Sequence, residues 1–325
     1  MVKGKGVVMA TGGTIAMRYD PVRKGVFPAV TGQQLVEAVP PLANVCPVEV
    51  YEFSNIPSSH MNPQLMLKLA KKVDETLEKE DVLGVVITHG TDTLEETAYF
   101  LDLILKTEKP VCLVGAMRSS AEISPDGPKN ILNAVKTAAC PEAIGKGVLV
   151  VLNDEIHSAV EVTKTHSANP NTFKSPFWGP LGYVDEDRVI FRRESLSRQK
   201  IDTNQVVDDV YLVKLATGID DFLIQALVDK KVKGIVIEGM GRGNIPPKVV
   251  PGIERAIKEN IPVILTTRCL GGRVLGVYGY EGAAKPLNEA GVILGGEISG
   301  QKARIKLMLA LSKTNDLQEL TKYFD

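Results

Sequence analysis

The sequence predicts an α/β protein of two domains, a larger N-terminal domain with a mostly parallel sheet and flanking helices and a smaller C-terminal α/β domain. The chain has 325 residues, roughly twice the length of a typical domain of about 150 residues. Short apolar runs alternate with amphipathic stretches, which is typical of a parallel sheet covered by helices. One polar stretch interrupts the alternation, so we expect domains at 1–191 and 210–325 joined by a linker at 192–209.

Composition and charge are those of an ordinary folded protein. Charged residues make up 24% of the chain and apolar residues 44%, which excludes disorder. The formal net charge is −1, so no overall field favours nucleic acid or an acidic membrane. No window approaches the roughly 18 consecutive apolar residues of a membrane helix. The N-terminus lacks the apolar region of a signal peptide, so we expect a cytoplasmic protein, or one whose leader was removed.

Strands and helices are expected in alternation along the N-terminal domain. Apolar runs that are almost free of polar groups predict buried strands at 7–10, 82–88, 111–114 and 147–152. The segment 64–80 carries leucine or valine every four residues, with Lys and Glu between them, and predicts a one-faced helix. A second helix is expected at 93–105. Cys112 lies inside an apolar run and should be a buried thiol, and the four distant cysteines favour no disulfide framework.

The second half of the chain begins with a segment of no clear period. Pro, Gly, Asn, Ser and Thr are frequent at 157–187, so we expect a long irregular segment, which is usually functional or else a linker. The alternation resumes after the linker. Strands are expected at 211–216, 234–238 and 262–267, and helices at 220–231 and 301–313.

Most familiar catalytic signatures are absent. The chain contains no G-x-x-x-x-G-K-[ST], no H-E-x-x-H and no G-x-S-x-G. GMGRGN at 239–244 superficially suggests dinucleotide binding, but its sixth residue is Asn rather than Gly, so a tight turn after a strand is favoured. The four histidines are isolated from one another, which favours structural or solvated roles over metal binding.

Two candidate groups follow predicted strands. Thr14 comes after a strand and a pair of glycines, which leave backbone N–H groups free to hold an oxyanion beside a hydroxyl nucleophile. Thr91 and Asp92 follow the run at 82–88, at the carboxyl edge where parallel sheets bind ligands. Each group has an ordinary alternative. Thr14 could belong to a glycine-rich turn with a capping threonine, and Thr91 or Asp92 could cap the next helix.

Two further candidate groups lie in loops. Ser58 and Ser59 stand after a proline and before the helix at 64–80, where serines are also common in turns. Lys164 lies in the irregular segment. A lysine in a dry site can have its pKa lowered enough to take a proton from a hydroxyl, whereas a surface lysine is the ordinary alternative. No single group is decisive, and their convergence is what points to hydroxyl-based catalysis.

TGGTIA at 11–16 together with ITHGTDTLEETAYFLDL at 87–103 resembles the bacterial-type L-asparaginase family, and this pair of motifs is highly specific. Further matches run from GAMR at 115–118 to QKAR at 301–304, so the resemblance covers essentially the full chain. It implies an amidohydrolase that releases ammonia from asparagine and leaves aspartate, with no metal or organic cofactor. It also implies a covalent acyl-enzyme and a homotetramer built from intimate dimers.

The resemblance assigns roles to the candidate residues. Thr14 attacks the amide carbon, and Thr91, Lys164 and Asp92 form a relay in which Lys164 activates Thr91. Ser58 holds the α-carboxylate of the substrate, and Asp92 holds its α-ammonium.

The resemblance further implies that a partner subunit completes the site. Asn244 matches an asparagine that the C-terminal domain of the partner supplies. A glutamate from the same domain is typical of the family, and Glu281 is the nearest candidate.

Two departures from the family pattern bear on activity. Members usually carry a tyrosine on the loop after TGGTIA. Here Phe27 stands at or beside that place, so we expect Tyr19 to supply the phenol from a lid at 17–31. Ser59 stands where members with both asparaginase and glutaminase activity often carry glutamine, which leaves glutaminase activity open. Two other functions share the fold, the amidase subunit of a tRNA-dependent amidotransferase and a non-catalytic amino-acid sensor.

Overall fold

The computed structural model of the chain describes residues 4–20, 22–196 and 198–324, without the side chains of Tyr19, Asp20, Val26 and Pro28. The chain divides into two compact units, Met1–Lys200 and Ile201–Asp325. Each unit is a sheet with helices, so the predicted α/β class is confirmed. Among the residues described, no helix is both long and apolar enough to cross a membrane.

The first unit contains an eight-stranded sheet in the order β12-β11-β8-β7-β6-β5-β1-β4. Neighbouring strands from β4 to β7 are all parallel. These five are β4 (Val48–Ile56), β1 (Lys5–Gly12), β5 (Val82–Thr88), β6 (Val111–Val114) and β7 (Val148–Leu152). The four strands predicted from apolar runs are confirmed, and nearly all their residues are buried. Because β1 and β5 are adjacent and parallel, the loops that follow them leave the same edge of the sheet.

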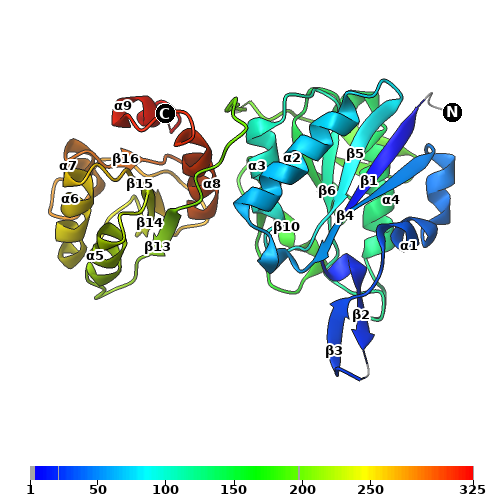
Figure 1. The fold of residues 1–325 in the computed structure, drawn as a ribbon, viewed down its shortest axis with the longest axis horizontal. Helices are drawn as coiled ribbons and strands as arrows, with labels where there is room; N and C mark the ends of the chain where they lie inside the picture. Colours follow the sequence, from blue (N-terminus) through cyan, green and yellow to red (C-terminus); the bar gives the residue numbers. More distant parts are fainter. Residues whose placement is uncertain (1–3, 21, 197, 325) are drawn as a thin grey trace. The chain divides into compact units, whose positions relative to one another are not determined.

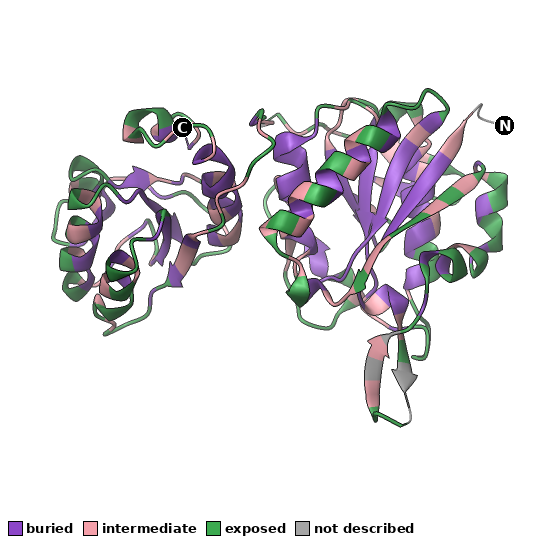
Figure 2. Ribbon diagram, viewed as in Figure 1, coloured by how far each residue is buried: buried purple, intermediate pink, exposed green. Residues whose placement is uncertain are grey.

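Helices pack on both faces of this sheet (Figure 1), which explains why the central strands β5, β6 and β7 are almost entirely apolar. On one face lie α2 (Pro63–Leu77) and α3 (Leu94–Ile104); α1 (Gly32–Glu37) and α4 (Gly127–Ala138) contact the other. The Asn62 side chain caps α2 by accepting from Leu65 N–H at 3.0 Å. Figure 2 shows the buried strands between the partly exposed helices, and the thiol of Cys112 is buried as predicted.

The segment 157–187 contains short strands that its sequence did not predict. Two of them, β8 (Glu155–Ser158) and β11 (Gly182–Asp185), extend the main sheet antiparallel, followed by β12 (Arg188–Phe191). Two others, β9 (Thr163–Lys164) and β10 (Phe173–Lys174), form a separate two-stranded sheet among the strands described. Strands of two to four residues are too short to show a period of two, so the pattern of the sequence could not reveal them.

A two-stranded hairpin projects from the first unit just after Thr14 (Figure 1). It consists of β2 (Met17–Asp20) and β3 (Gly25–Pro28), paired antiparallel. It occupies the segment 17–31 for which a lid is predicted.

The second unit is built on a parallel sheet of four strands in chain order. They are β13 (Val210–Lys214), β14 (Gly234–Gly239), β15 (Val263–Thr267) and β16 (Ile293–Leu294). The helices are α5 (Phe222–Asp229), α6 (Val250–Lys258), α7 (Ala284–Glu289), α8 (Gly300–Ala310) and α9 (Leu317–Thr321). Buried side chains of α5, α6 and α7 form a second apolar core with those of the strands, and α8 contacts β13, β14 and β15.

Candidate functional site

Thr14 follows β1 at a bend that requires glycine. Gly12 has a φ of +109°, and Gly13 has φ +84° with ψ −179°, which is essentially restricted to glycine. Gly13 N–H donates to Ile56 O at 3.0 Å and thereby fixes the bend. Thr14 is half-buried and begins the 3-10 helix η1 (Thr14–Ala16), whose cap position belongs to Gly13. Because the cap is a glycine, the alternative that Thr14 caps this helix is wrong.

The loop of Thr14 is in backbone contact with the loop of Thr91. A Cβ atom added to Gly13 would lie 2.3 Å from both N and Cα of Gly90. One added to Gly90 would lie 2.6 Å from Oγ of the buried Ser58. Three segments far apart in sequence therefore meet at one edge of the sheet, as the predicted strand ends imply.

The loop of Ser58 is tied to the same place by a hydrogen bond. The Thr93 hydroxyl donates to the Ser58 carbonyl at 2.8 Å. Ser58 begins the 3-10 helix η3 (Ser58–His60), in which Ser59 is exposed. Of the two predicted serines, Ser58 thus lies in the contact between the loops and Ser59 at the surface.

Lys164 connects Thr91 and Asp92. Its Nζ lies 3.0 Å from Thr91 Oγ1 and 2.7 Å from Asp92 Oδ1. Thr91 is buried, and the Lys164 side chain is only 15% exposed, whereas the Asp92 side chain is 70% exposed. The surface-lysine alternative is therefore wrong. An amine between a hydroxyl and a carboxylate can pass a proton between them.

The capping alternative for Thr91 and Asp92 is also wrong. Helix α3 has Thr93 at its cap position, with no side-chain hydrogen bond to the helix end. The side chains of Thr91 and Asp92 instead face Lys164. The turn between β5 and α3 thus presents two polar groups to a third that lies 73 residues further along the chain.

Lys164 is held by its backbone as well as by its side chain. Its N–H donates to Glu95 Oε2 at 2.9 Å, and β9 pairs it with the buried Phe173 of β10. Sequence reasoning missed this role of Glu95, because an acidic residue in the first turn of a helix is ordinarily explained by the helix dipole. The sign of this role is that Glu95 is buried, and it contacts a residue 69 positions further along the chain, which the sequence alone does not reveal.

His89 supports the same turn as an uncharged group. Burial lowers the pKa of His89 from 6.5 to about 4, although the hydrogen bond to Gly90 O opposes the shift. Its Nδ1 faces Gly90 O at 2.7 Å, and since a carbonyl can only accept, the proton lies on Nδ1. Nε2 then accepts from the Thr97 hydroxyl at 3.0 Å. At neutral pH the His89 ring therefore adds no charge to the turn that carries Thr91 and Asp92.

The predicted lid carries two residues of interest. Tyr19 lies in β2 opposite Val26, but its side chain is outside the described part of the structure. Phe27 lies in β3, opposite Arg18, and the Arg23 guanidinium stands 5.2 Å from the centre of its ring. The role of Tyr19 as the source of a phenol near Thr14 therefore stays a prediction.

Asn244 and Glu281 lie close together in the second unit. Ile245 N–H, next to Asn244, donates to the carbonyl of Gly282, next to Glu281, at 2.8 Å. Asn244 closes the tight turn predicted after β14 through two 2.8 Å backbone bonds to Met240. Its Oδ1 is buried and finds no hydrogen-bond partner in the described residues, and Glu281 is exposed. A buried amide oxygen without a partner is a candidate for contact with a ligand.

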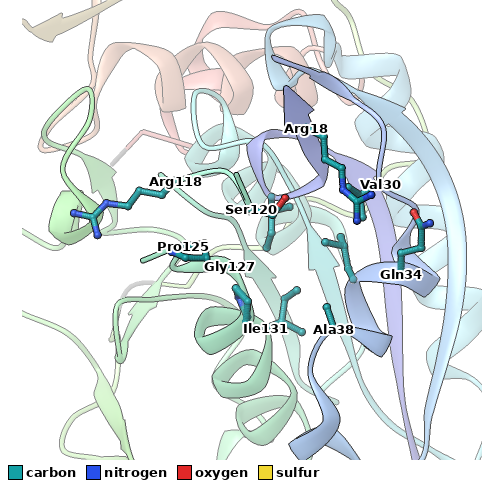
Figure 3. A pocket seen from close by; sticks show the side chains of 12 residues that line it. Arg18, Val30, Gln34, Ala38, Arg118, Ser120, Pro125, Gly127 and Ile131 are labelled. Atoms are coloured by element: carbon teal, nitrogen blue, oxygen red, sulfur yellow. The ribbon is translucent and has the colours of Figure 1, made fainter. Parts of the chain in front are cut away.

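A cavity of about 70 Å³ lies beside η1. Its walls are mainly apolar residues of η1, α1 and α4, with Arg18, Gln34 and Ser120 at the polar part (Figure 3). The Arg118 side chain extends away from the others. Ile15 lines it, but Thr14, Thr91 and Lys164 do not. The cavity is thus separate from the contact of Thr91 and Asp92 with Lys164.

The polar groups at this site are hydroxyls, an amine and a carboxylate. In the described part of the chain, no three His, Cys, Asp or Glu side chains are grouped so that they could hold a metal ion.

Known proteins resemble the chain over its whole length. Residues 6–197 match the family "Asparaginase, N-terminal". Residues 209–324 match the family "Glutaminase/Asparaginase C-terminal domain". L-asparaginase 2 of Bacillus subtilis (strain 168) is 40% identical, over 98% of this chain and 85% of its own. The crystal structure of a probable cytoplasmic L-asparaginase from Campylobacter jejuni matches with a TM-score of 0.90, 37% identity and 99% coverage of both chains. One of the subunits of glutamyl-tRNA(Gln) amidotransferase from Pyrococcus abyssi (strain GE5 / Orsay) is 37% identical, over 97% of this chain and 74% of its own.

Proposed function

The chain belongs to the asparaginase family and is an L-asparaginase, and we propose that it hydrolyses the side-chain amide of L-asparagine through a covalent ester on Thr14. The observation that carries the mechanism is the position of Lys164 Nζ, 3.0 Å from Thr91 Oγ1 and 2.7 Å from Asp92 Oδ1. This set lies next to the Gly13–Gly90 contact that joins the loop of Thr14 to the loop of Thr91.

The reaction proceeds in two steps. The Thr14 oxygen forms a bond to the amide carbon as its proton passes to the relay of Thr91 and Lys164. The relay returns a proton to the amide nitrogen, the C–N bond breaks, and ammonia departs. Water attacks the resulting ester, giving aspartate and restoring the Thr14 hydroxyl. An amide is a poor electrophile, so backbone N–H groups beside the glycine bend must stabilise the negative charge on its oxygen. Such donors contribute about 3–4 kcal/mol each where they have been removed.

Thr91, Lys164 and Asp92 form the proton relay. Lys164 in its neutral form takes the proton of the Thr91 hydroxyl, and Asp92 stabilises the ammonium that results. The low exposure of Lys164 supports this role, because a largely buried amine stays in contact with Thr91 and Asp92 rather than with water. Glu95 holds the backbone of Lys164 and thereby keeps Nζ within reach of Thr91.

The substrate is held as a zwitterion. The Ser58 hydroxyl and backbone bind its α-carboxylate, and Asp92 binds its α-ammonium. A carboxylate has about four acceptor positions, so Asp92 can bind the substrate while one oxygen stays with Lys164. Ser59, the exposed middle residue of η3, bears on the choice between asparagine and glutamine. A difference of one methylene changes binding by only about 1–3 kcal/mol, so some glutaminase activity is part of the proposal.

The remaining parts of the site come from the lid and the second unit. Tyr19 supplies a phenol near Thr14 from the β2–β3 hairpin. Asn244 and Glu281, which are adjacent in the second unit, complete the site of a partner subunit in a homotetramer. The unpaired Oδ1 of Asn244 supports this role. A cytoplasmic location is proposed by analogy with the Campylobacter jejuni relative, a probable cytoplasmic L-asparaginase.

The direct test removes the two hydroxyls. In Thr14→Ala and in Thr91→Ala, ammonia release from L-asparagine should fall by at least about 10³-fold. Thr107→Ala is the matched control, because that hydroxyl only accepts from Lys109 N–H in a turn before β6 and should leave turnover unchanged. Acid quenching during turnover, followed by mass spectrometry, should find an acylated peptide containing Thr14. Full activity in both variants would remove the mechanism.

One relative favours a second function, the amidase subunit of a tRNA-dependent amidotransferase. That protein is longer than this chain, which covers 74% of it. Turnover of free L-asparagine without tRNA distinguishes the two functions, because a component of the amidotransferase would depend on its tRNA and its partner. Binding of aspartate without any turnover of asparagine would instead point to an amino-acid sensor.

A further inference from the structure

A polar network centred on a buried histidine contacts the hairpin of β9 and β10, which carries Lys164. We call it the hairpin latch, and it consists of Glu155, His157, Lys174 and Ser175. His157 is fully buried, with Nδ1 3.1 Å from Ser175 Oγ and Nε2 3.2 Å from Glu155 Oε2. Lys174 Nζ donates to the same Glu155 oxygen at 2.8 Å.

The protonation of the latch follows from its partners. The hydrogen bond from His157 and a further one from Lys174 lower the pKa of Glu155 below its ordinary value, against the opposing effect of burial. An ionised carboxylate can only accept, so Nε2 of His157 carries the proton that faces it. Nδ1 of the same ring forms its hydrogen bond with the Ser175 hydroxyl. Each polar group in the chain from Ser175 to Lys174 therefore has a partner.

The latch joins two separate pieces of the fold. Glu155 and His157 lie on β8, which is hydrogen-bonded into the main sheet between β7 and β11. Lys174 ends β10 and Ser175 follows it, and β10 pairs with the strand that contains Lys164. Among the strands described, β9 and β10 form no ladder to the main sheet. Side-chain hydrogen bonds of the latch thus connect the β9–β10 hairpin to the main sheet, a connection that backbone hydrogen bonds between strands would otherwise make.

Burial makes these bonds dependent on the position of the hairpin. A fully buried imidazole and a partly buried carboxylate lose their water on folding, and each is costly without its partners. Ser175, the partner of the imidazole at Nδ1, and Lys174, the cationic partner of the carboxylate, both come from the other piece of the fold. A displaced hairpin would break both bonds. The network therefore favours one position of the hairpin and of Lys164, which is paired with Phe173.

We propose that the hairpin latch is a positioning device for the reaction, with His157 as its central positioning residue, and that it sets the distance between Lys164 Nζ and Thr91 Oγ1. The inference rests on the proposed function, since it requires Lys164 to act in the relay. A displacement of about 1 Å at a reacting group can cost about 10²-fold in rate. The latch lies outside the substrate contacts named above, so its loss changes kcat rather than the affinity for asparagine.

The experiment is a set of double-mutant cycles. His157→Gln, Ser175→Ala and Lys174→Met are each made in the natural chain and in Lys164→Met, and kcat and KM are measured per folded molecule. We expect each latch variant to lower kcat about 10-fold with KM within about twofold, and to cause no further fall in the Lys164→Met background. Lys174→Arg, which keeps the charge, should recover most of kcat.

Two features keep the test sharp. The Lys174 side chain is 30% exposed, so its replacement leaves a folded protein even where the buried His157→Gln variant does not fold. Lys146→Met is the matched control, because Lys146 makes a Lys–Glu pair of the same 2.8 Å length with Glu194, a residue outside the hairpin. That control should keep kcat, whatever its effect on thermal stability.

The outcomes separate this inference from the proposed function. Full activity in Lys164→Met overturns the relay and the latch with it. Loss of activity in Lys164→Met together with natural kcat in all three latch variants overturns the latch alone. An equal fall of kcat with and without Lys164 would show that the latch acts independently of this lysine, and would overturn the inference as well.

Discussion

Replacing Gly13 by alanine tests whether the two threonine loops must touch. The added Cβ would lie 2.3 Å from Gly90 N and Cα, whereas ordinary contacts begin at 3.4 Å, so one loop must retreat by about 1.1 Å. Both atoms belong to the backbone and cannot rotate away. A residue with a side chain at φ +84° also stores about 1–3 kcal/mol of strain.

The expected result is a loss of turnover larger than the loss of stability. The backbone strain lowers the free energy of unfolding by about 1–3 kcal/mol. The 1.1 Å displacement separates Thr14 from Thr91 and Ser58, and should lower kcat/KM for L-asparagine by about 10²-fold. Denaturant unfolding and a coupled assay of ammonia release measure the two effects.

Gly218→Ala is the matched control in the second unit. Gly218 has nearly the same φ, +80°, but an added Cβ would meet nothing within 4 Å. It should therefore lose stability through the unfavourable φ alone, with unchanged turnover. Natural kcat/KM in Gly13→Ala would refute the claim that close approach of the two loops assembles the site, and an equal loss in both variants would attribute the effect to strain alone.

Three further predictions concern protonation and substrate binding. Between pH 7 and pH 4, the natural chain should lose about 3 kcal/mol more unfolding free energy than His89→Gln, because the unfolded chain binds a proton below pH 6.5 and the buried ring only below about 4. Denaturant unfolding across this range checks the sign, and parallel curves would contradict it. Asp92→Asn should raise KM for asparagine about 10-fold or more but leave KM for succinamic acid, which lacks the α-ammonium, nearly unchanged; an equal rise for both would exclude Asp92 from ammonium binding. Tyr19→Phe should lower kcat about 10²-fold in steady-state assays, and full turnover would end the assignment of the phenol to Tyr19.

The sequence predicted the central strands well and the outer ones poorly. The bounds 82–88 and 111–114 agree with β5 and β6 at both ends, because strands buried on both faces are uninterrupted apolar runs. The two-residue strands β9 and β10 have no such pattern because they are too short to show one.

The candidate site divides in the same way. Thr14 and Thr91 could be singled out because each follows a strand, and strand ends of a parallel sheet share one edge. Lys164 could not be placed by spacing, since it reaches Thr91 across 73 residues, and only the family resemblance linked them. Glu95 and the hairpin latch escaped both arguments. Their side chains are polar groups of common type whose role depends on burial.

Exposure changes sharply along the turn after β5, and this change supports the division of tasks in the proposed reaction. Thr91 is buried while the side chain of Asp92, the next residue, is 70% exposed. Groups that exchange a proton with each other benefit from being kept from water, because water then does not compete for their hydrogen bonds. A group that binds a diffusing zwitterion must instead be open to solvent before the substrate arrives. Lys164 contacts both residues, so one largely buried lysine links the dry hydroxyl to the open carboxylate, and binding of the α-ammonium at Asp92 would change the electrostatic environment in which Thr91 is activated.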